Sequence, residues 1–256
     1  MTIENALNNP YTKWMEGKGP HASIVISSRV RLARNLNDYN FPHLQDEESG
    51  RKVMELAKDA LTAQEVQELV DGIEFMSLEE LSPLDRLILM EKHLISPQLA
   101  DGEGPCHGIA LSEDEAVSVM VNEEDHLRLQ VLFPALQLKE AWNLASKVDD
   151  LLESRLDFAF DEQYGYLTCC PTNVGTGLRA SVMMHLPAIA MTNQANRFFM
   201  SLSKLGFVVR GLYGEGTQAK GNLFQVSNQI TLGLSEEELI GNLTSVSRQI
   251  IEQEQL

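Results

Sequence analysis

The stretch GIALSEDEAVSVMVNEEDHLRLQVLF, residues 108–133, decides the fold class. Three runs of apolar, strand-forming residues follow one another, and a short acidic segment joins each run to the next. Such short connections join antiparallel neighbours, because parallel strands need a crossover of about a dozen or more residues. The sequence therefore predicts an antiparallel meander here.

Further strands are predicted on both sides of this meander, where short apolar or alternating runs lie between turn residues. They cover residues 21–35, 73–78, 164–170, 207–216 and 223–233. Residues 171–181 are interpreted as a Gly-rich segment.

Helices are predicted where apolar residues recur at spacings of three and four. Ser77 with Glu80 forms a capping-box pattern, a helix is expected from Pro83, and Ser235 is expected to cap the last helix. The other helices cover residues 4–16 with a break near Pro10, 46–70, 135–153 and 188–206. We expect an α+β fold, an antiparallel sheet flanked by α-helices, formed by one large domain.

The composition excludes several classes of partner and compartment. The chain has 20 Lys and Arg against 37 Asp and Glu, a net charge of -17, which argues against binding nucleic acid or an anionic membrane surface. No apolar stretch approaches the roughly 18 residues of a transmembrane helix. Three cysteines, two of them adjacent, give no disulfide framework, so a cytoplasmic protein is predicted.

Arginines form the main candidate site. Arg29 and Arg31 are two residues apart in a predicted strand, so both side chains project from one face. Alone, this pair fits a solvated strand edge equally well. Arg128, Arg179 and Arg210 also lie beside strand or Gly-rich sequence, and five converging guanidinium groups would make a polyphosphate cradle.

Other motifs are ambiguous when each is taken alone. The segment CPTNVGTGLRAS, residues 170–181, has glycines that would let backbone N–H groups approach an anion, but it fits an ordinary turn as well. Cys170 fits either a reactive thiolate or a small buried residue. His93 fits a structural histidine, and the acids at 123–125 fit a solvated turn. The histidines and cysteines show no spacing of metal ligands, so no protein-held metal is predicted.

Together, four motifs resemble those of the ATP:guanidino phosphotransferases, the family of creatine kinase and arginine kinase. They are SSRVRLAR, VNEEDHLR, CPTNVGTGLRAS and RGLYGEG, in that order over residues 27–216. EKHLIS (91–96) and PTNVGTGLRASVMMHLP (171–187) are most similar to the bacterial protein arginine kinases. The resemblance implies a glutamine synthetase/guanidino kinase-like fold.

The resemblance also implies a domain organisation. Residues 1–23 are expected to be an N-terminal helical lead, and residues 24–256 the catalytic domain. The helical N-terminal domain of the small-molecule kinases and the C-terminal phosphoarginine-binding and oligomerisation domain of the bacterial kinases are expected to be absent.

The implied activity is transfer of the ATP γ-phosphate to the guanidinium of arginine residues in proteins, with ATP and Mg²⁺ as cofactors. Glu124 matches the catalytic glutamate, and Glu215 is the candidate second carboxylate, although holding its loop is an equal alternative. The implied partners are proteins with accessible arginines, a heat-shock repressor and a Clp ATPase, in a stress response. Implied nucleotide-binding positions are Ser27, Ser28, Arg29, Val30, Arg31, His93, Arg128, Arg179, Ala180, Ser181, Val182, Met183, Arg210, Gly211, Leu212, Tyr213, Gly214 and Glu215.

Two departures from the small-molecule arginine kinases bear on the substrate. Tyr213 stands where those kinases have an arginine, and it agrees with the bacterial type. Gln218 stands where they have a glutamate that contacts the substrate. Two alternatives therefore remain: a kinase of a small free guanidino compound, and a catalytically weak nucleotide-binding adaptor. The separate roles of Glu123 and Asp125 stay open.

Overall fold

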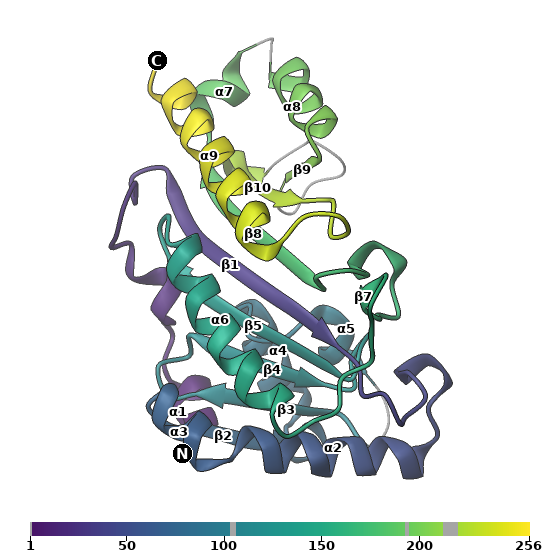
Figure 1. Cartoon of the computed structure of the whole chain (residues 1–256). Coiled ribbons are helices and arrows are strands. Elements are labelled where there is room, and N and C mark those ends of the chain that lie inside the picture. Colours follow the sequence, from purple (N-terminus) through teal and green to yellow (C-terminus); the bar gives the residue numbers. More distant parts are fainter. Residues whose placement is uncertain (1, 103–105, 193–194, 212–219) are drawn as a thin grey trace.

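The computed structural model describes residues 2–102, 106–192, 195–211 and 220–256, and these form one large antiparallel sheet with helices on both faces (Figure 1). The eight strands of this sheet lie in the order β2-β3-β4-β5-β1-β8-β10-β9. Their bounds are β1 Val25–Arg34, β2 Ile73–Ser77, β3 Gly108–Ser112, β4 Val117–Val121, β5 Leu127–Pro134, β8 Leu178–His185, β9 Phe207–Gly211 and β10 Leu223–Asn228. β6 Phe160–Asp161 and β7 Gly165–Tyr166 form a separate pair. The predicted meander is confirmed, because β3, β4 and β5 pair in sequence.

The helices largely follow the predicted ranges. Helix α4 begins at Pro83, and Ser235 caps α9 through a capping box. Their bounds are α1 Thr2–Asn8, α2 Glu47–Leu61, α3 Gln64–Leu69, α4 Pro83–Glu91, α5 Pro97–Ala100, α6 Leu138–Glu153, α7 Pro187–Met191, α8 Ala195–Lys204 and α9 Glu236–Gln255, with short 3-10 turns η1 Lys13–Glu16, η2 Pro42–Leu44, η3 Leu78–Glu80, η4 Pro171–Asn173 and η5 Lys220–Asn222. Within the described ranges, no helix has the length and apolar character to cross a membrane.

Strand alternation separates an apolar face from a polar face of the sheet. On β1, Val30 and Leu32 join the large core beneath α2, α6 and α9, whereas Arg29 and Arg31 point to the opposite, back face. A second, smaller core lies between α1, α4, α5 and strands β3 and β4. Helices α1, α4 and α5 pack on the back face near β2, β3 and β4, and η1 packs against β5 and β1 (Figure 1).

Several element predictions were wrong. Residues 46–70 form two helices, because Ala63 is in an extended conformation between Leu61, where the first ends, and Gln64, where the second begins. Residues 188–206 also divide, with Thr192 in an extended conformation after α7. The predicted strand 164–170 shrinks to Gly165–Tyr166, since the N–H of Cys169 donates to the Asp125 carboxylate instead of to a strand.

Strand β8 was missed by sequence reasoning. It pairs with both β1 and β10. Its buried positions Leu178, Ala180, Val182 and Met184 alternate with more polar ones, a signal that the neighbouring Gly-rich interpretation obscured.

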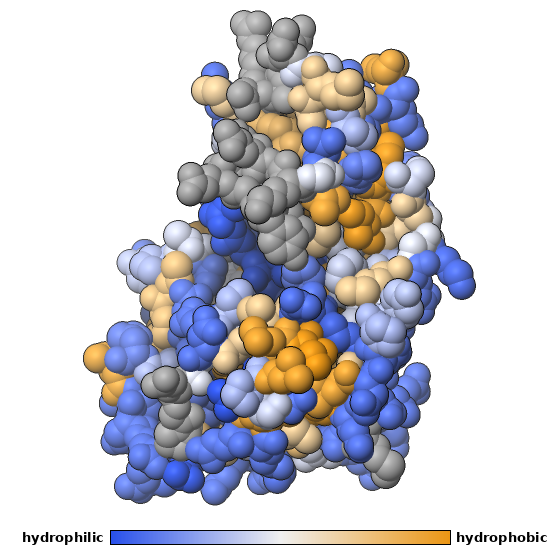
Figure 2. Space-filling view, turned by 180° about the vertical axis from the view of Figure 1, so that it is seen from behind, coloured by the Kyte–Doolittle hydropathy of each residue, from blue (hydrophilic) through white to orange (hydrophobic). Residues whose placement is uncertain are grey.

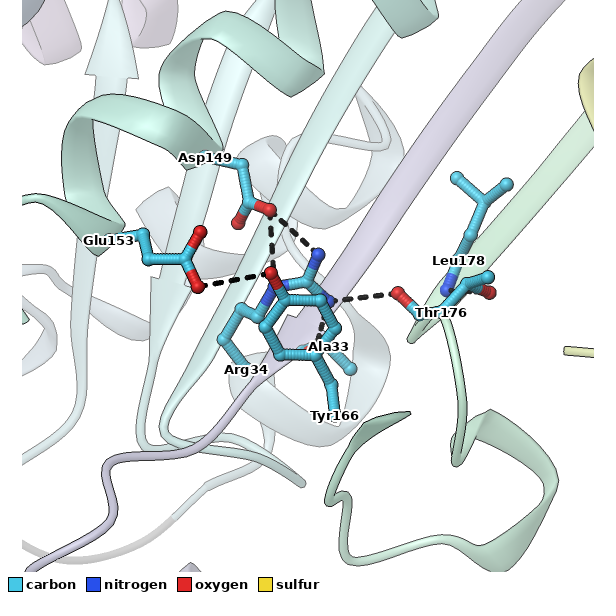
Figure 3. Close-up of polar contacts among 7 residues, drawn as sticks. All are labelled: Ala33, Arg34, Asp149, Glu153, Tyr166, Thr176 and Leu178. Carbon is cyan, nitrogen blue, oxygen red and sulfur yellow. Dashed lines mark hydrogen bonds and ion pairs between the residues drawn. The ribbon is translucent and has the colours of Figure 1, made fainter. Parts of the chain in front are cut away.

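Arg34 ties the Gly-rich segment to the rest of the domain (Figure 3). Its guanidinium is buried and donates to Asp149 Oδ2 on α6 at 2.7 and 3.2 Å and to the Thr176 carbonyl at 3.0 Å. The Tyr166 ring lies 3.5 Å from the guanidinium carbon, and its hydroxyl donates to Glu153. The acids that end α6, which oppose its dipole, therefore include the partner of a buried arginine.

The glycines of this segment allow its backbone to lie close to other parts of the protein. Gly177 has φ +64°, and a Cβ there would lie 2.5 Å from Arg34 Nη1 and 2.6 Å from the Ala33 carbonyl oxygen. Gly175 has φ +111°, and a Cβ would lie 2.3 Å from the Thr231 carbonyl oxygen. Only glycine meets both demands at these positions.

Candidate active site

A cavity of about 1070 Å³ lies on the back face of the sheet, between its strands and the α4–α5 segment. All five predicted arginines line it: Arg29 and Arg31 from β1, Arg128 from β5, Arg179 from β8 and Arg210 from β9. Figure 2 shows this side of the molecule, which is hollowed and hydrophilic near its middle. The five arginines therefore lie around one cavity.

These arginines repel one another. Arg31 lies directly opposite Arg179 in the β1–β8 register, and like charges placed this way destabilise a sheet. Burial, followed by the charges of Arg128 and Arg179, lowers the pKa of Arg29 to about 10. The pKa values of Arg31 and Arg179 are lowered too, first by burial and then by neighbouring arginines. A bound anion would relieve the repulsion among these positive charges, so the cavity is suited to bind one.

Unsatisfied donors support the same conclusion. Nε of Arg31 and Nε of Arg179 are buried without a hydrogen-bond partner among the described residues. Buried donors of this kind are normally paired. Guanidinium groups bind phosphate oxygens through two parallel hydrogen bonds, so a triphosphate fits the donors present.

Glu123 holds one of these arginines in place. Its two carboxylate oxygens lie 2.5 and 2.6 Å from Arg128 Nη1, and Ser96 Oγ donates to Oε1 at 2.5 Å. Burial alone would raise the pKa of Glu123, but Arg128 and Ser96 outweigh it and the pKa is lowered. Glu123 is therefore a charged positioning residue.

Glu124 has a different environment, although it adjoins Glu123. Within the described ranges, its carboxylate makes no hydrogen bond or ion pair. Burial and then the charge of Asp125 raise its pKa, against the opposing effects of Arg128 and Arg31. A free carboxylate with a raised pKa, in a cavity lined by five arginines, is suited to accept a proton.

The acids at 123–125 lie in the connection between β4 and β5. Residues 122–126 form a turn with Asn122 at φ +56°, and β5 begins only at Leu127. Glu124 and Arg128 both line the cavity, but they do not share the face of one strand. Asp125 points elsewhere and accepts from Asn35 Nδ2 at 2.6 Å and from the Cys169 N–H at 2.7 Å, so it anchors the turn.

His93 lines the cavity from the link between α4 and α5, in a left-handed conformation with φ +60°. Trp14 Nε1 donates to the Lys92 carbonyl at 3.0 Å, and Gln130 Nε2 donates to the His93 carbonyl at 2.8 Å. The Trp14 and His93 rings lie 5.4 Å apart. Burial and then Arg29 lower the His93 pKa, which favours a neutral ring. Sequence reasoning missed Trp14 and Gln130, which lie far from His93 along the chain.

Side chains alternate along each strand, so the remaining predicted positions lie on opposite faces of the sheet. Ser27, Ser181 and Met183 line a small hollow beside Arg29 and His93. Four predicted contacts, in contrast, have side chains on the helix face of the sheet: Ser28, Val30, Ala180 and Val182. For example, Ser28 Oγ donates to the Ala135 carbonyl between β5 and α6, so these side chains do not reach the cavity.

Only the first two residues of the RGLYGEG motif, Arg210 and Gly211, belong to the described part of the chain. Gly211 ends β9. Leu212, Tyr213, Gly214, Glu215 and Gln218 lie outside the described residues.

Gln225 on β10 is a further lining residue that the sequence did not single out. It lies opposite Arg210 in the β9–β10 register and accepts from Arg29 Nη2 at 3.0 Å. A glutamine between the apolar residues Phe224 and Val226 was the available signal.

Residues 52–256 match the family model described as "ATP:guanido phosphotransferase, C-terminal catalytic domain". A protein-arginine kinase of Desulforamulus reducens is 56% identical over 254 residues, covering 99% of this chain and 71% of that protein. A protein-arginine kinase of Symbiobacterium thermophilum is 58% identical over 244 residues, covering 95% of this chain and 69% of that protein.

Solved structures agree with this fold. A duplicated taurocyamine kinase from Schistosoma mansoni with bound transition state analog components superposes with a TM-score of 0.82 at 24% identity, covering 97% of this chain but only 35% of that one. Lombricine kinase superposes with a TM-score of 0.77 at 21% identity, covering 96% of this chain and 70% of that one. The chain therefore belongs to the ATP:guanido phosphotransferase family, and curated relatives named protein-arginine kinase match nearly its whole length.

Proposed function

We propose that this chain is an ATP-dependent protein-arginine kinase with Glu124 as its catalytic base. The observation that carries the proposal is the position of Glu124 between two cavities. It lines the arginine-rich cavity, and it also lines a second cavity of about 580 Å³ that contains no arginine or lysine among its described lining residues. A phosphate donor on one side and a guanidinium on the other would meet at this carboxylate.

The chemistry follows from this arrangement. A guanidinium is a weak nucleophile because it stays protonated in proteins. Glu124 would align one nitrogen through charge-assisted hydrogen bonds and accept its proton as that nitrogen bonds to the γ-phosphorus. The bond between the γ-phosphorus and the β–γ bridging oxygen breaks, and ADP leaves with that electron pair. Arg29, Arg31, Arg128, Arg179 and Arg210 would hold the phosphates in line and offset the charge of the transferring group.

Mg²⁺ would be held mainly by ATP oxygens and water. No group of three or more potential metal ligands lies together among the described residues, and Mg²⁺ in kinases commonly uses few protein ligands. Bound Mg²⁺ would neutralise phosphate charge. His93, between Trp14 and the arginines, would contact the nucleotide. Glu215 is proposed as a second carboxylate on the family resemblance alone.

The test is incubation with Mg-ATP and an unfolded arginine-rich protein, with phosphosite mass spectrometry under non-acidic conditions. Phosphoarginine is expected for the wild type. Glu124→Gln should lower turnover by at least about 10²-fold with ATP binding retained, because general base catalysis contributes roughly that much or more. Glu113→Gln, the same change in the exposed β3–β4 turn, is the matched control.

The other outcomes identify the alternatives. Product formed only from free arginine would replace the proposal with a small-molecule kinase. ATP binding without product, equal in wild type and Glu124→Gln, would replace it with a nucleotide-binding adaptor. The predicted heat-shock repressor and Clp ATPase rest on the family resemblance, and co-purification of phosphorylated partners would test them. The predicted cytoplasmic location rests on the cysteine content.

A further inference from the structure

The second cavity has a composition opposite to that of the first. Its walls come from separate parts of the chain: η2 and the start of α2, the segment before β3, the turn at 122–124, and Cys169. Four acids line it, Asp46, Glu47, Glu123 and Glu124, and no lysine or arginine is among its described lining residues. It shares Gln98, Glu123 and Glu124 with the arginine-rich cavity, so the two spaces meet at the proposed base.

Most of the negative charge of this cavity lies where Asp46 and Glu47 line it. Glu123 is neutralised by Arg128, so it contributes little net charge. Asp46 and Glu47 are exposed at the N-terminus of α2. The hydrogen bond from the Ser49 backbone lowers the pKa of Asp46, which keeps it ionised. Glu47 pairs with Arg51 one turn along the helix, but both side chains are more than half exposed, so solvent screens this pair far more than the buried Glu123–Arg128 pair.

A buried acceptor at this cavity also lacks a partner. Asn122 is 3% exposed and lines the cavity. Its Nδ2 donates to the carbonyls of Gly50 and Cys106, but its Oδ1 has no hydrogen-bond partner among the described residues. Buried acceptors are normally satisfied, so this oxygen points to a ligand that brings an N–H group.

We propose that the second cavity binds the polypeptide that flanks the target arginine, and that Asp46 and Glu47 select neutral or basic flanking residues over acidic ones. The inference rests on the proposed function and deepens it. A 580 Å³ space is larger than one guanidinium needs, so it holds neighbouring residues of an extended substrate as well. An aspartate or glutamate in the flank would meet Asp46 and Glu47 as like charges, whereas a lysine or arginine would be attracted.

The test compares peptides that contain one arginine and differ only at the two residues on each side: all lysine, all serine or all aspartate. For the wild type, kcat/KM is expected to fall by about tenfold or more from the lysine to the aspartate series, and the ratio should shrink as salt is raised. Asp46→Asn keeps a good helix cap. Together with Glu47→Gln it should reduce the ratio at least about threefold.

Glu48→Gln is the matched control, because Glu48 lies in the same helical turn, carries the same charge and does not line the cavity. It should leave the ratio as in the wild type. Equal kcat/KM for all three wild-type series, or a ratio unchanged in the Asp46→Asn/Glu47→Gln variant, overturns the inference and leaves the proposed function standing. Phosphorylation of no peptide and no protein would instead refute the proposed function.

Discussion

Replacing Arg29 by methionine should stabilise the nucleotide-free protein while weakening ATP binding. The pKa of Arg29 is about 10, lowered by burial and then by Arg128 and Arg179, against about 12.5 for a free guanidinium. Because each pH unit corresponds to about 1.4 kcal/mol, holding this charge in the empty site costs roughly 3 kcal/mol. The pKa is lowered, so the cost is fully present at neutral pH and would be relieved only above about pH 10.

The substitution also removes favourable contacts. Arg29 donates to Gln225 at 3.0 Å and, more weakly, to Ser181 at 3.4 Å. Losing them costs about 1–2 kcal/mol together. Arg29→Met should therefore raise the free energy of unfolding by about 1–2 kcal/mol, or roughly 2–8 °C in Tm for a chain of this size. The loss of a charged phosphate donor should weaken ATP binding roughly 10- to 100-fold.

Urea unfolding without nucleotide and calorimetric titration with ATP measure the two effects. Arg155→Met is the matched control: this arginine is exposed, pairs with Glu65 outside the cavity, and should change neither quantity by much. The reasoning is that repulsion among the arginines destabilises the empty site and that a bound polyanion relieves it. A less stable Arg29→Met protein, or one that binds ATP as tightly as the wild type, would refute this reasoning.

Three further predictions concern the residues that support the site. Arg34→Met should lower the free energy of unfolding by about 3–5 kcal/mol, because it leaves Asp149 buried without its cation; a loss under about 1 kcal/mol in urea melts would contradict this. Burial lowers the pKa of His126 to about 4, so stability should decline as pH falls from about 6.5 towards 4, by roughly 2–3 kcal/mol. Urea melts at pH 7 and 4.5 should show a smaller decline for His126→Gln. Trp14→Phe, which removes the hydrogen bond to the Lys92 carbonyl next to His93, should raise KM for ATP about fivefold with little change in kcat; an unchanged KM would contradict a role of this bond in holding His93.

Local patterns were sufficient for much of the fold. The meander, the helix starts at Pro83 and Ser235 and the strand that carries Arg29 and Arg31 all follow from periodicity, caps and short connections. The length of the 164–170 strand could not be predicted, because a carboxylate from Asp125, distant in the chain, takes the backbone N–H that a strand partner would need. The family motifs further pointed to Glu124 before any contact was known.

The sequence by itself determined which residue types alternate on each strand, and thus that a row of arginines would face one side of a sheet. Only the tertiary structure decided what each charge does. It brought Glu123 against Arg128, left Glu124 free between two cavities and buried Arg34 against Asp149. The physical reason is that alternation is a local property of the chain, whereas burial and pairing depend on which distant strands become neighbours.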